Sequence, residues 1–197
     1  MPKNIAVLVS GGGSNLQALI DAQAKGGLEN GKITLVISST PDAYALTRAQ
    51  NAGIPTKIVD KKSHPNRSEY TKAILNALEG ERIDLVVLAG FMFILDGCFF
   101  DKYKAINVHP SLIPAFCGAG FYGLRVHKAA LEKGVKLTGA TVHFVIEGCD
   151  EGPIIAQKAV PVLADDTPEV LQKRVMEQAE WVILPKAVSM FCKGEID

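Results

Sequence analysis

Residues Ile5–Asn15 read IAVLVSGGGSN, an apolar, β-branched run that passes directly into three glycines and two small polar residues. Such a run is typical of a strand buried on both faces of a parallel sheet. A helical pattern follows and is closed by Gly26 and Gly27. Strand, glycine loop and helix in this order aim free backbone N–H groups and the positive end of a helix dipole at an anion. The stretch therefore predicts a phosphate site at the start of an α/β fold.

Two stricter phosphate motifs are not met. The dinucleotide fingerprint requires a third glycine where Leu16 stands and an acidic residue in place of Ser38–Thr40. The nucleoside-triphosphate loop requires Gly-Lys-Ser/Thr, which the chain lacks here. The glycine loop therefore suits a phosphate monoester better than a nicotinamide cofactor or ATP. The simpler alternative is a tight turn with a Ser or Asn helix cap.

Apolar runs and helical patterns alternate after this loop. Because helices of this length connect parallel strands by right-handed crossovers, we expect an α/β fold with a doubly wound, mostly parallel sheet of the Rossmann-like type. Two later alternating runs predict an antiparallel C-terminal hairpin. The predicted strands are Ile5–Val9, Ile33–Ser38, Thr56–Val59, Leu85–Leu88, a run ending at Val108, Leu137–Ile146 and Ile154–Val160. The predicted helices include Ala43–Ala52, Arg67–Leu78, Val126–Glu132 and one that begins at Thr167–Pro168 and is broken or kinked by Pro185.

The composition is that of an ordinary globular protein, with 48% hydrophobic residues and a formal net charge of zero. Zero net charge gives no electrostatic reason to expect nucleic acid or an acidic membrane as a partner. No apolar run reaches the roughly 18 residues of a membrane span, and the N-terminus lacks a cleavable signal pattern. The four cysteines form no Cys-x-x-Cys pair. We therefore expect a cytoplasmic protein with a single domain over residues 1–197, divided into halves at about residue 100.

Asn107 and His109 stand two residues apart, where a strand opens into a loop stiffened by Pro110 and Pro114. Positions two apart in an extended segment point to the same side. An amide and an imidazole therefore share one face at the carboxyl end of a strand, where α/β proteins bind ligands. A structural loop histidine is the alternative. The apolar segment Ala89–Leu95 either walls a pocket or forms a buried helical turn.

Two other titratable residues have simple structural explanations. His143 lies in an alternating strand and is expected to be a sheet residue, and Asp150 stands in a sharp turn that favours aspartate. The residues that could instead hold a metal are His109, His127, His143 and Asp150. No pair among them has a characteristic ligand spacing, so no metal is expected.

Four segments together resemble the phosphoribosylglycinamide formyltransferase family, the folate-dependent transformylases of purine synthesis. They are Ser10–Gln17, Leu88–Met92, Ile106–Leu112 and Gly139–Val145, in the family's order, and the likeness runs from about Asn4 to Phe191. The third segment belongs to the wider folate formyltransferase superfamily. The first segment is typical of fewer proteins and indicates the glycinamide ribonucleotide branch.

The resemblance implies transfer of a formyl group from the co-substrate 10-formyltetrahydrofolate to the amine of glycinamide ribonucleotide. The catalytic residues it implies are Asn107, His109 and Asp150. For the ribose phosphate it implies Gly13, Ser14 and Asn15, and for the glycyl end Glu180. The folate residues it implies are Arg67, Met92, Phe93, Ile94, Leu95 and Asn107. We expect a monomer or homodimer whose partners are these small molecules.

This chain departs from the family pattern in two places. Relatives often carry Arg where Phe93 stands, which leaves backbone contacts to the folate there, and the loop Phe116–Gly123 is longer than in some members. The alternatives are other enzymes of the superfamily and a non-catalytic nucleotide-binding module. A deformylase typically adds an N-terminal regulatory domain and the transfer-RNA enzyme a basic C-terminal one, whereas this chain begins at the glycine-loop strand and stops at Asp197. A binding module would not need Asn107, His109 and Asp150.

Overall fold

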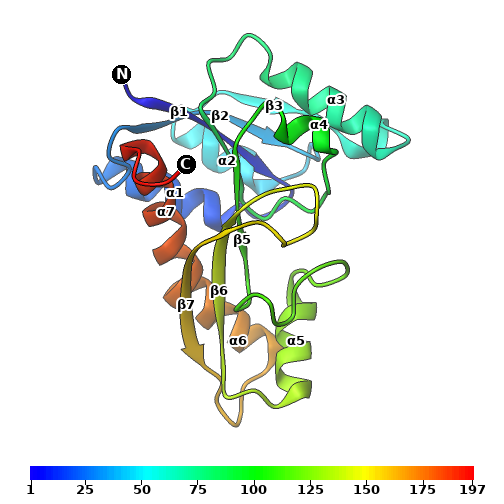
Figure 1. The fold of residues 1–197 in the computed structure, drawn as a ribbon, viewed down its shortest axis with the longest axis vertical. Helices are drawn as coiled ribbons and strands as arrows, with labels where there is room; N and C mark the ends of the chain where they lie inside the picture. Colours follow the sequence, from blue (N-terminus) through cyan, green and yellow to red (C-terminus); the bar gives the residue numbers. More distant parts are fainter.

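Seven strands form one sheet in the computed structural model, which describes Met1–Asp197, and their order across the sheet is β3-β2-β1-β4-β5-β6-β7 (Figure 1). Neighbouring strands from β3 to β5 are parallel, and β6 and β7 pair antiparallel to β5 and to each other. The predicted fold class and the antiparallel C-terminal hairpin are thus confirmed. The strands are β1 (Lys3–Val9), β2 (Gly31–Ser38), β3 (Thr56–Ile58), β4 (Leu85–Leu88), β5 (Ala105–His109), β6 (Leu137–Phe144) and β7 (Ile154–Pro161).

The helices connect these strands and cover both faces of the sheet. The α-helices are α1 (Ser14–Ala24), α2 (Tyr44–Asn51), α3 (Arg67–Leu78), α4 (Gly97–Phe100), α5 (Leu124–Lys133), α6 (Pro168–Val175) and α7 (Trp181–Lys193). A 3₁₀ turn, η1 (Lys61–Ser63), precedes α3, and a π-helical segment, η2 (Met176–Glu180), joins α6 to α7. None of the helices is both long and apolar enough to cross a membrane.

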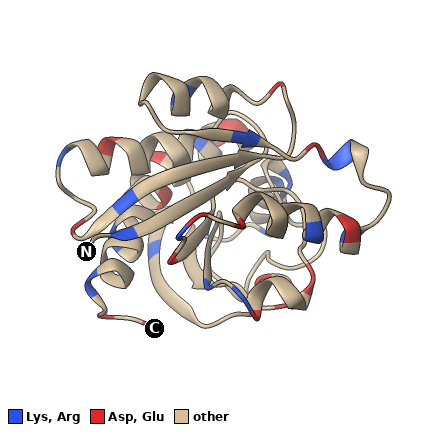
Figure 2. Ribbon diagram, turned by 90° about the horizontal axis from the view of Figure 1, so that it is seen from above, with Lys and Arg blue, Asp and Glu red and all other residues tan.

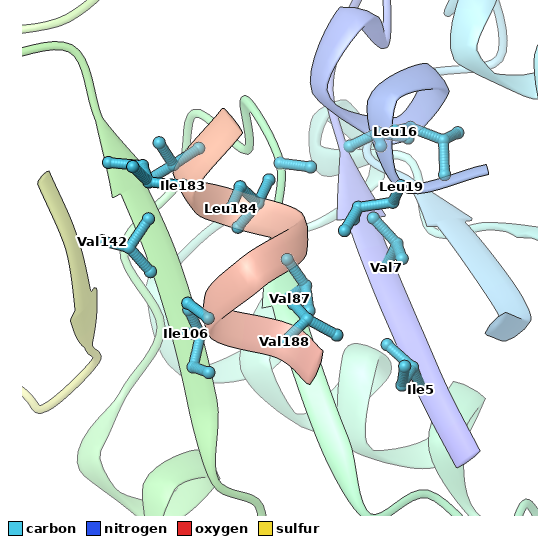
Figure 3. Packing of buried hydrophobic residues seen from close by; sticks show 14 of the residues in the cluster. Ile5, Val7, Leu16, Leu19, Val87, Ile106, Val142, Ile183, Leu184 and Val188 are labelled. Atoms are coloured by element: carbon cyan, nitrogen blue, oxygen red, sulfur yellow. The ribbon is translucent and has the colours of Figure 1, made fainter. Parts of the chain in front are cut away.

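The larger hydrophobic core lies between the sheet and α1, α2, α6 and α7. Figure 3 shows Leu184 and Val188 of α7 packed among side chains from β1, β4, β5 and β6, with Leu16 of α1 close by. All five residues from Ile5 to Val9 are completely buried, as expected of a central parallel strand. The second core, with Tyr70, lies between the opposite face of the sheet and α3 and α4.

The strand order reverses direction next to β1. From β1 the chain continues to β2 and β3 on one side, and then returns to place β4 and β5 on the other side. The loops that follow β1 and β4 therefore diverge and leave a crevice at the carboxyl ends of these strands. In doubly wound sheets this reversal is where ligands bind. The topology alone thus positions the glycine loop beside the segment that follows β4.

The sequence left open whether Pro185 breaks or kinks the last helix, and a break is not found. Pro185 does not end the last helix, because α7 continues through it to Lys193. Proline lacks an N–H and disturbs the ladder of the preceding turn, and here the wider π turn η2 lies just upstream. Such turns are frequent at functional sites. Positive and negative side chains are interspersed along the ribbon (Figure 2), as the zero net charge suggested.

Candidate active site

A cavity of about 450 Å³ opens at the carboxyl ends of β1, β4 and β5. Its wall comes from the start of α1, the segment after β4, the end of β5, the loop before α5, the β6–β7 turn and η2. The predicted site residues that line it are Ser14, Asn15, Met92, Phe93, Ile94, Leu95, Asn107, His109, Asp150 and Glu180. A second cavity, of about 400 Å³, lies on another flank of α1 and contains no histidine. The predicted chemistry therefore belongs to the larger cavity.

His109 and Asp150 form a buried pair in the cavity. Their Nδ1 and Oδ2 atoms are 3.4 Å apart, and the two side chains are 6% and 9% exposed. The other ring nitrogen, Nε2, lies 2.9 Å from the carbonyl oxygen of Phe116. Because a carbonyl only accepts hydrogen bonds, Nε2 carries a hydrogen, and donation to both neighbours requires the doubly protonated imidazolium. The geometry thus suits an imidazolium–carboxylate pair.

Asp150 is held in its charged form by its neighbours. Burial alone raises the pKa of this carboxyl, but the adjacent imidazoles of His143 and His109 and the backbone N–H of Gly118 lower it, and the net pKa lies below its usual range. Gly118 N–H donates to Oδ2 at 2.9 Å. Asp150 also has a positive φ of 60°, which the sharp β6–β7 turn requires. The turn that looked merely structural in the sequence therefore delivers the carboxylate to the histidine.

His143 belongs to this site, although the sequence indicated an ordinary sheet residue. The antiparallel register places it directly opposite Asn107, and its Nε2 lies 3.2 Å from Asn107 Nδ2. Its Nε2 is also 3.6 Å from Oδ1 of Asp150. The signal that could have identified it is the pairing of β5 with β6, which the alternating pattern of β6 alone does not reveal.

A third imidazole lines the cavity, and it comes from α5. His127 is completely buried and neither ring nitrogen has a hydrogen-bond partner in the protein. Burial lowers the pKa of this imidazole to about 4, and the nearby charge of His109 adds to the effect. His127 is therefore neutral at physiological pH. Its side chain was weighed in the sequence only as a metal ligand, and the structure contains no group of three or more His, Cys, Asp or Glu residues placed to hold a metal ion.

The start of α1 is free to bind an anion. No side chain caps this helix, because its N-cap residue is Gly13 in the left-handed conformation, and the first intrahelical bond runs from Gln17 N to Gly13 O. The preceding backbone N–H groups at the helix start therefore have no capping partner. The simpler interpretation of the sequence, a Ser or Asn cap, is wrong. Ser14 and Asn15 instead face the cavity.

Gly13 itself does not line the cavity, and its role is conformational. Its φ is +70°, and a Cβ at this position would lie 2.6 Å from Cβ of Ala45 in α2. Only glycine fits the close approach of the loop to α2. Gly12, by contrast, has no such φ and nothing within 4 Å of an added Cβ.

We expect Gly13→Ala to lower the free energy of unfolding by about 2 kcal/mol or more, since strain at positive φ adds to the clash with α2. The matched variant Gly12→Ala should change stability by less than about 0.5 kcal/mol. Urea unfolding of both variants measures this difference. Equal stability of the two would contradict the packing role of Gly13.

Glu180 and Asn15 form a buried polar pair at the start of α1. The Nδ2 group of Asn15 donates to Oε2 of Glu180 at 2.6 Å, and Oδ1 of Asn15 has no partner. Burial raises the pKa of the Glu180 carboxyl to about 6, although the hydrogen bond from Asn15 opposes the rise. Glu180 is 6% exposed and is supplied by η2. The pair presents unsatisfied acceptors for a ligand that carries N–H or O–H donors.

The segment Met92–Leu95 is irregular and walls the cavity, so the pocket interpretation of the apolar run is the correct one. Its backbone is held at both ends: Met92 N–H donates to Oγ of Ser10 at 3.0 Å, and Arg67 donates to the carbonyl of Leu95 at 2.5 Å. Arg67 also pairs with Asp96 at 2.5 Å and does not line the cavity. It therefore shapes the wall from outside.

Phe93 occupies an aromatic cluster. Its ring lies 5.6 Å from that of Tyr70 and 5.9 Å from that of Phe91, both edge-on. The side chain of Phe93 is thus packed against the second core. Its neighbours Met92 and Ile94 are about half exposed. This wall suits a flat apolar ligand.

The chain is similar to known formyltransferases along most of its length. A family model described as "Formyl transferase" matches residues 3–188. The Escherichia coli protein named phosphoribosylglycinamide formyltransferase is 40% identical over 195 residues, which are 98% of this chain and 89% of that protein. The human trifunctional purine biosynthetic protein adenosine-3 is 46% identical over 98% of this chain, but this chain spans only 18% of its length.

Solved structures give the same result. Glycinamide ribonucleotide transformylase 1 from Symbiobacterium toebii superposes with a TM-score of 0.91 at 42% identity, covering 98% of this chain and 89% of that one. Phosphoribosylglycinamide formyltransferase from Brucella melitensis superposes with a TM-score of 0.87 at 40% identity, covering 100% and 99%. The similarity thus includes the whole sheet and every element that lines the cavity.

Proposed function

Because this chain belongs to the formyl transferase family, we propose that it transfers a formyl group from 10-formyltetrahydrofolate to the amine of 5-phosphoribosylglycinamide. The product is formylglycinamide ribonucleotide, an intermediate of de novo purine synthesis. The observation that carries the proposal is the coexistence, in one cavity, of the His109–Asp150 pair and an uncapped helix start. The first supplies acyl-transfer chemistry, and the second supplies a place for the acceptor's phosphate.

The acceptor is anchored at two points in this proposal. Its phosphate binds the N-terminus of α1 beside Ser14, where free N–H groups and the helix dipole favour a dianion. Its glycyl end meets Glu180 and the unpartnered Oδ1 of Asn15, which accept hydrogen bonds from N–H groups. Ser14 at the phosphate anchor and Asn15 at the glycyl anchor are the first two residues of α1. Binding at both anchors therefore orients the amine toward the cavity.

The donor occupies the apolar part of the cavity. The pterin lies against the segment Met92–Leu95. The side chains of Ser10 and Arg67 hold the backbone of this segment in place. The N-formyl group then reaches the end of β5, where Asn107 and His109 line the cavity. Bound this way, the two substrates meet at the His109–Asp150 pair, and their alignment removes much of the entropic cost of a bimolecular step.

The reaction requires charge stabilisation more than a nucleophile. Attack of the amine on the formyl carbon makes a tetrahedral centre with an oxyanion, and preplaced donors contribute about 3–4 kcal/mol each to its stabilisation. Asn107 supplies an amide N–H. The imidazolium of His109 supplies a positive charge, while its two N–H groups stay with the Phe116 carbonyl and Asp150. Asp150 keeps the imidazole oriented and passes a proton from the amine, through water, to the leaving folate nitrogen.

Direct transfer is supported by the state of the two possible nucleophiles. The hydroxyl of Ser111 is completely buried, lies outside the cavity wall and donates to the carbonyl of Ala115. Burial and the neighbouring Asp150 raise the pKa of the Cys117 thiol, so the reactive thiolate is scarce at neutral pH. Neither residue is suited to form a covalent intermediate.

A single assay tests the proposal against hydrolysis of the same donor. We expect rapid consumption of 10-formyltetrahydrofolate only when the acceptor is present, with stoichiometric formylated product and little free formate. The acceptor without its phosphate should react poorly, because it loses the anchor at α1. Fast release of formate without acceptor would identify a deformylase, and binding of both ligands without turnover would identify a binding module.

The carboxyl of Glu180 gives a prediction that depends on pH. A rise of its pKa from 4.5 to about 6 on folding means that the folded protein binds this proton more tightly than the unfolded chain. Stability therefore falls as the pH rises from about 4.5 to 6, by about 2 kcal/mol in total. Glu180→Gln removes this cost, so we expect it to raise the free energy of unfolding at pH 8 and to have little effect below pH 4.5.

The same substitution should weaken acceptor binding. The KM for glycinamide ribonucleotide should rise in Glu180→Gln at pH 8, while the KM for the folate changes little. Urea unfolding at the two pH values and initial rates measure the two effects. Glu177→Gln, an exposed carboxylate of the same π turn, is the control for stability. A variant of Glu180 that is less stable than the native protein at pH 8 would contradict the assignment.

A further inference from the structure

His143 has two ring nitrogens with different partners. Its Nδ1 lies 2.8 Å from the carbonyl oxygen of Phe144, and its Nε2 lies 3.2 Å from Nδ2 of Asn107. Only 1% of the residue is exposed, so water does not compete for either position. Because a carbonyl oxygen only accepts, the hydrogen of a neutral ring is on Nδ1. Nε2 then carries a lone pair.

That lone pair determines which end of the Asn107 amide faces His143. A lone pair accepts a hydrogen bond, so it favours the NH₂ group of Asn107 over the carbonyl oxygen of the same amide. Oδ1 of Asp150 lies 3.6 Å from Nε2, beyond hydrogen-bond distance, so the amide of Asn107 is the hydrogen-bond partner of this nitrogen. One N–H of Asn107 is thus used by His143. Asn107 lines the cavity, and its second N–H has no hydrogen-bond partner in the protein.

The backbone around His143 is built to keep this arrangement. Gly152 packs so closely against the Phe144 carbonyl that an added Cβ would lie 1.7 Å from its oxygen. Phe144 N–H in turn donates to the carbonyl of Pro153 at 2.9 Å. The acceptor for Nδ1 is therefore fixed between two strands.

We propose that His143 is a positioning residue whose neutral ring, protonated on Nδ1, accepts a hydrogen bond from Asn107 and so directs an amide N–H, rather than the amide oxygen, at the formyl oxygen. An amide turned the other way would present an acceptor to a developing oxyanion and would destabilise it. The part of the inference that concerns the formyl oxygen rests on the proposed function. The protonation site and the amide orientation do not.

The protonation site is measured directly by ¹⁵N NMR on the wild-type protein at pH 8. The chain has four histidines, so single substitutions assign the ring signals. We expect His143 to show a hydrogen on Nδ1 and a bare Nε2. In Asn107→Asp the partner becomes an acceptor, and we expect His143 to gain a hydrogen on Nε2 as well. A hydrogen on Nε2 in the wild-type ring overturns the inference, whatever reaction the protein catalyses.

Kinetics separates positioning from simple space filling. Gln at position 143 extends a carbonyl oxygen toward the place of Nε2, Asn ends near the place of Nδ1, and Phe fills the ring volume without an acceptor. We expect His143→Phe and His143→Asn to lower kcat by about ten- to a hundredfold, less than the 10²–10³-fold loss on removing a donor outright. His143→Gln should retain more of kcat, and the KM of both substrates should change by less than about threefold.

The dependence on Asn107 completes the test. In an Asn107→Ala background, His143→Phe should cause little further loss, because the group that it positions is gone. His64→Ala, which removes a histidine that does not line the cavity, is the control. Equal losses in the Gln, Asn and Phe variants, or additive losses with Asn107→Ala, overturn the positioning role.

Discussion

Asp150→Asn and His109→Ala are each expected to lower kcat by about 10²–10⁴-fold, the range for loss of a positioned acid–base group or oxyanion donor. Asn keeps an oxygen for the Gly118 N–H, but it removes the charge that pairs with His109 at 3.4 Å. Alanine at position 109 removes the ring altogether. Initial rates at saturating substrates measure the losses, and the KM values should change much less.

The two losses should not add, because the residues act as one unit. The double variant is expected to be about as slow as the slower single variant. His64→Ala controls for loss of a histidine elsewhere. The low pKa of Asp150 means that its charge stabilises the folded protein above the carboxyl's usual pKa and that this contribution is lost as the pH falls, so each variant also needs a thermal melt at the assay pH. Wild-type turnover in either folded variant would contradict its role.

Gly152→Ala is expected to have the largest effect on stability among substitutions that add one carbon near the site. The new Cβ would lie 1.7 Å from the carbonyl oxygen and 2.7 Å from the carbonyl carbon of Phe144, so the backbone of β6 must move. A forced fit of this kind costs about 3 kcal/mol. Because the same carbonyl accepts the hydrogen bond from Nδ1 of His143, kcat should fall as well. Urea unfolding and initial rates measure both effects.

Gly148→Ala is the matched control in the same turn. Its Cβ would meet only the carboxylate and stem of the Glu151 side chain, which can rotate away. We expect a change of less than about 1 kcal/mol and little effect on kcat. If Gly148→Ala were as unstable as Gly152→Ala, any added carbon would disturb the turn and the special role of the Phe144 carbonyl would be lost.

Periodicity in the sequence was enough to predict most of the fold. The run Ile5–Val9 and the glycines after it are a local signal, because a strand buried on both faces must be continuously apolar. The alternation of strands and helices then leaves few topologies, since crossovers are short and right-handed. The sequence left open whether Pro185 breaks or kinks the last helix, and the structure shows why. Whether a proline ends a helix depends on the packing of the turn before it, which the sequence pattern does not contain.

For the site as well, the sequence predicted the features that depend on local pattern and missed those that depend on packing. Asn107 and His109 could be singled out because two positions on one strand share a face, and the family resemblance then added Asp150 and Glu180. The partners that give these residues their chemistry are distant in sequence: His143 faces Asn107 only through the β5–β6 register, and Asn15 meets Glu180 across 165 residues. Such pairings depend on how elements dock, so no local pattern reveals them.

The sequence by itself determined the order of strands and helices, the glycine loop after the first strand and the strand end that carries Asn107 and His109. The tertiary structure decided which charges are buried together and which groups are left without partners. Burial raises the pKa of Glu180 and lowers that of His127. The packing of the β6–β7 turn places Asp150 beside His109. The physical reason is that solvation and electrostatic interactions depend on distance in space, whereas hydrophobic periodicity is written along the chain.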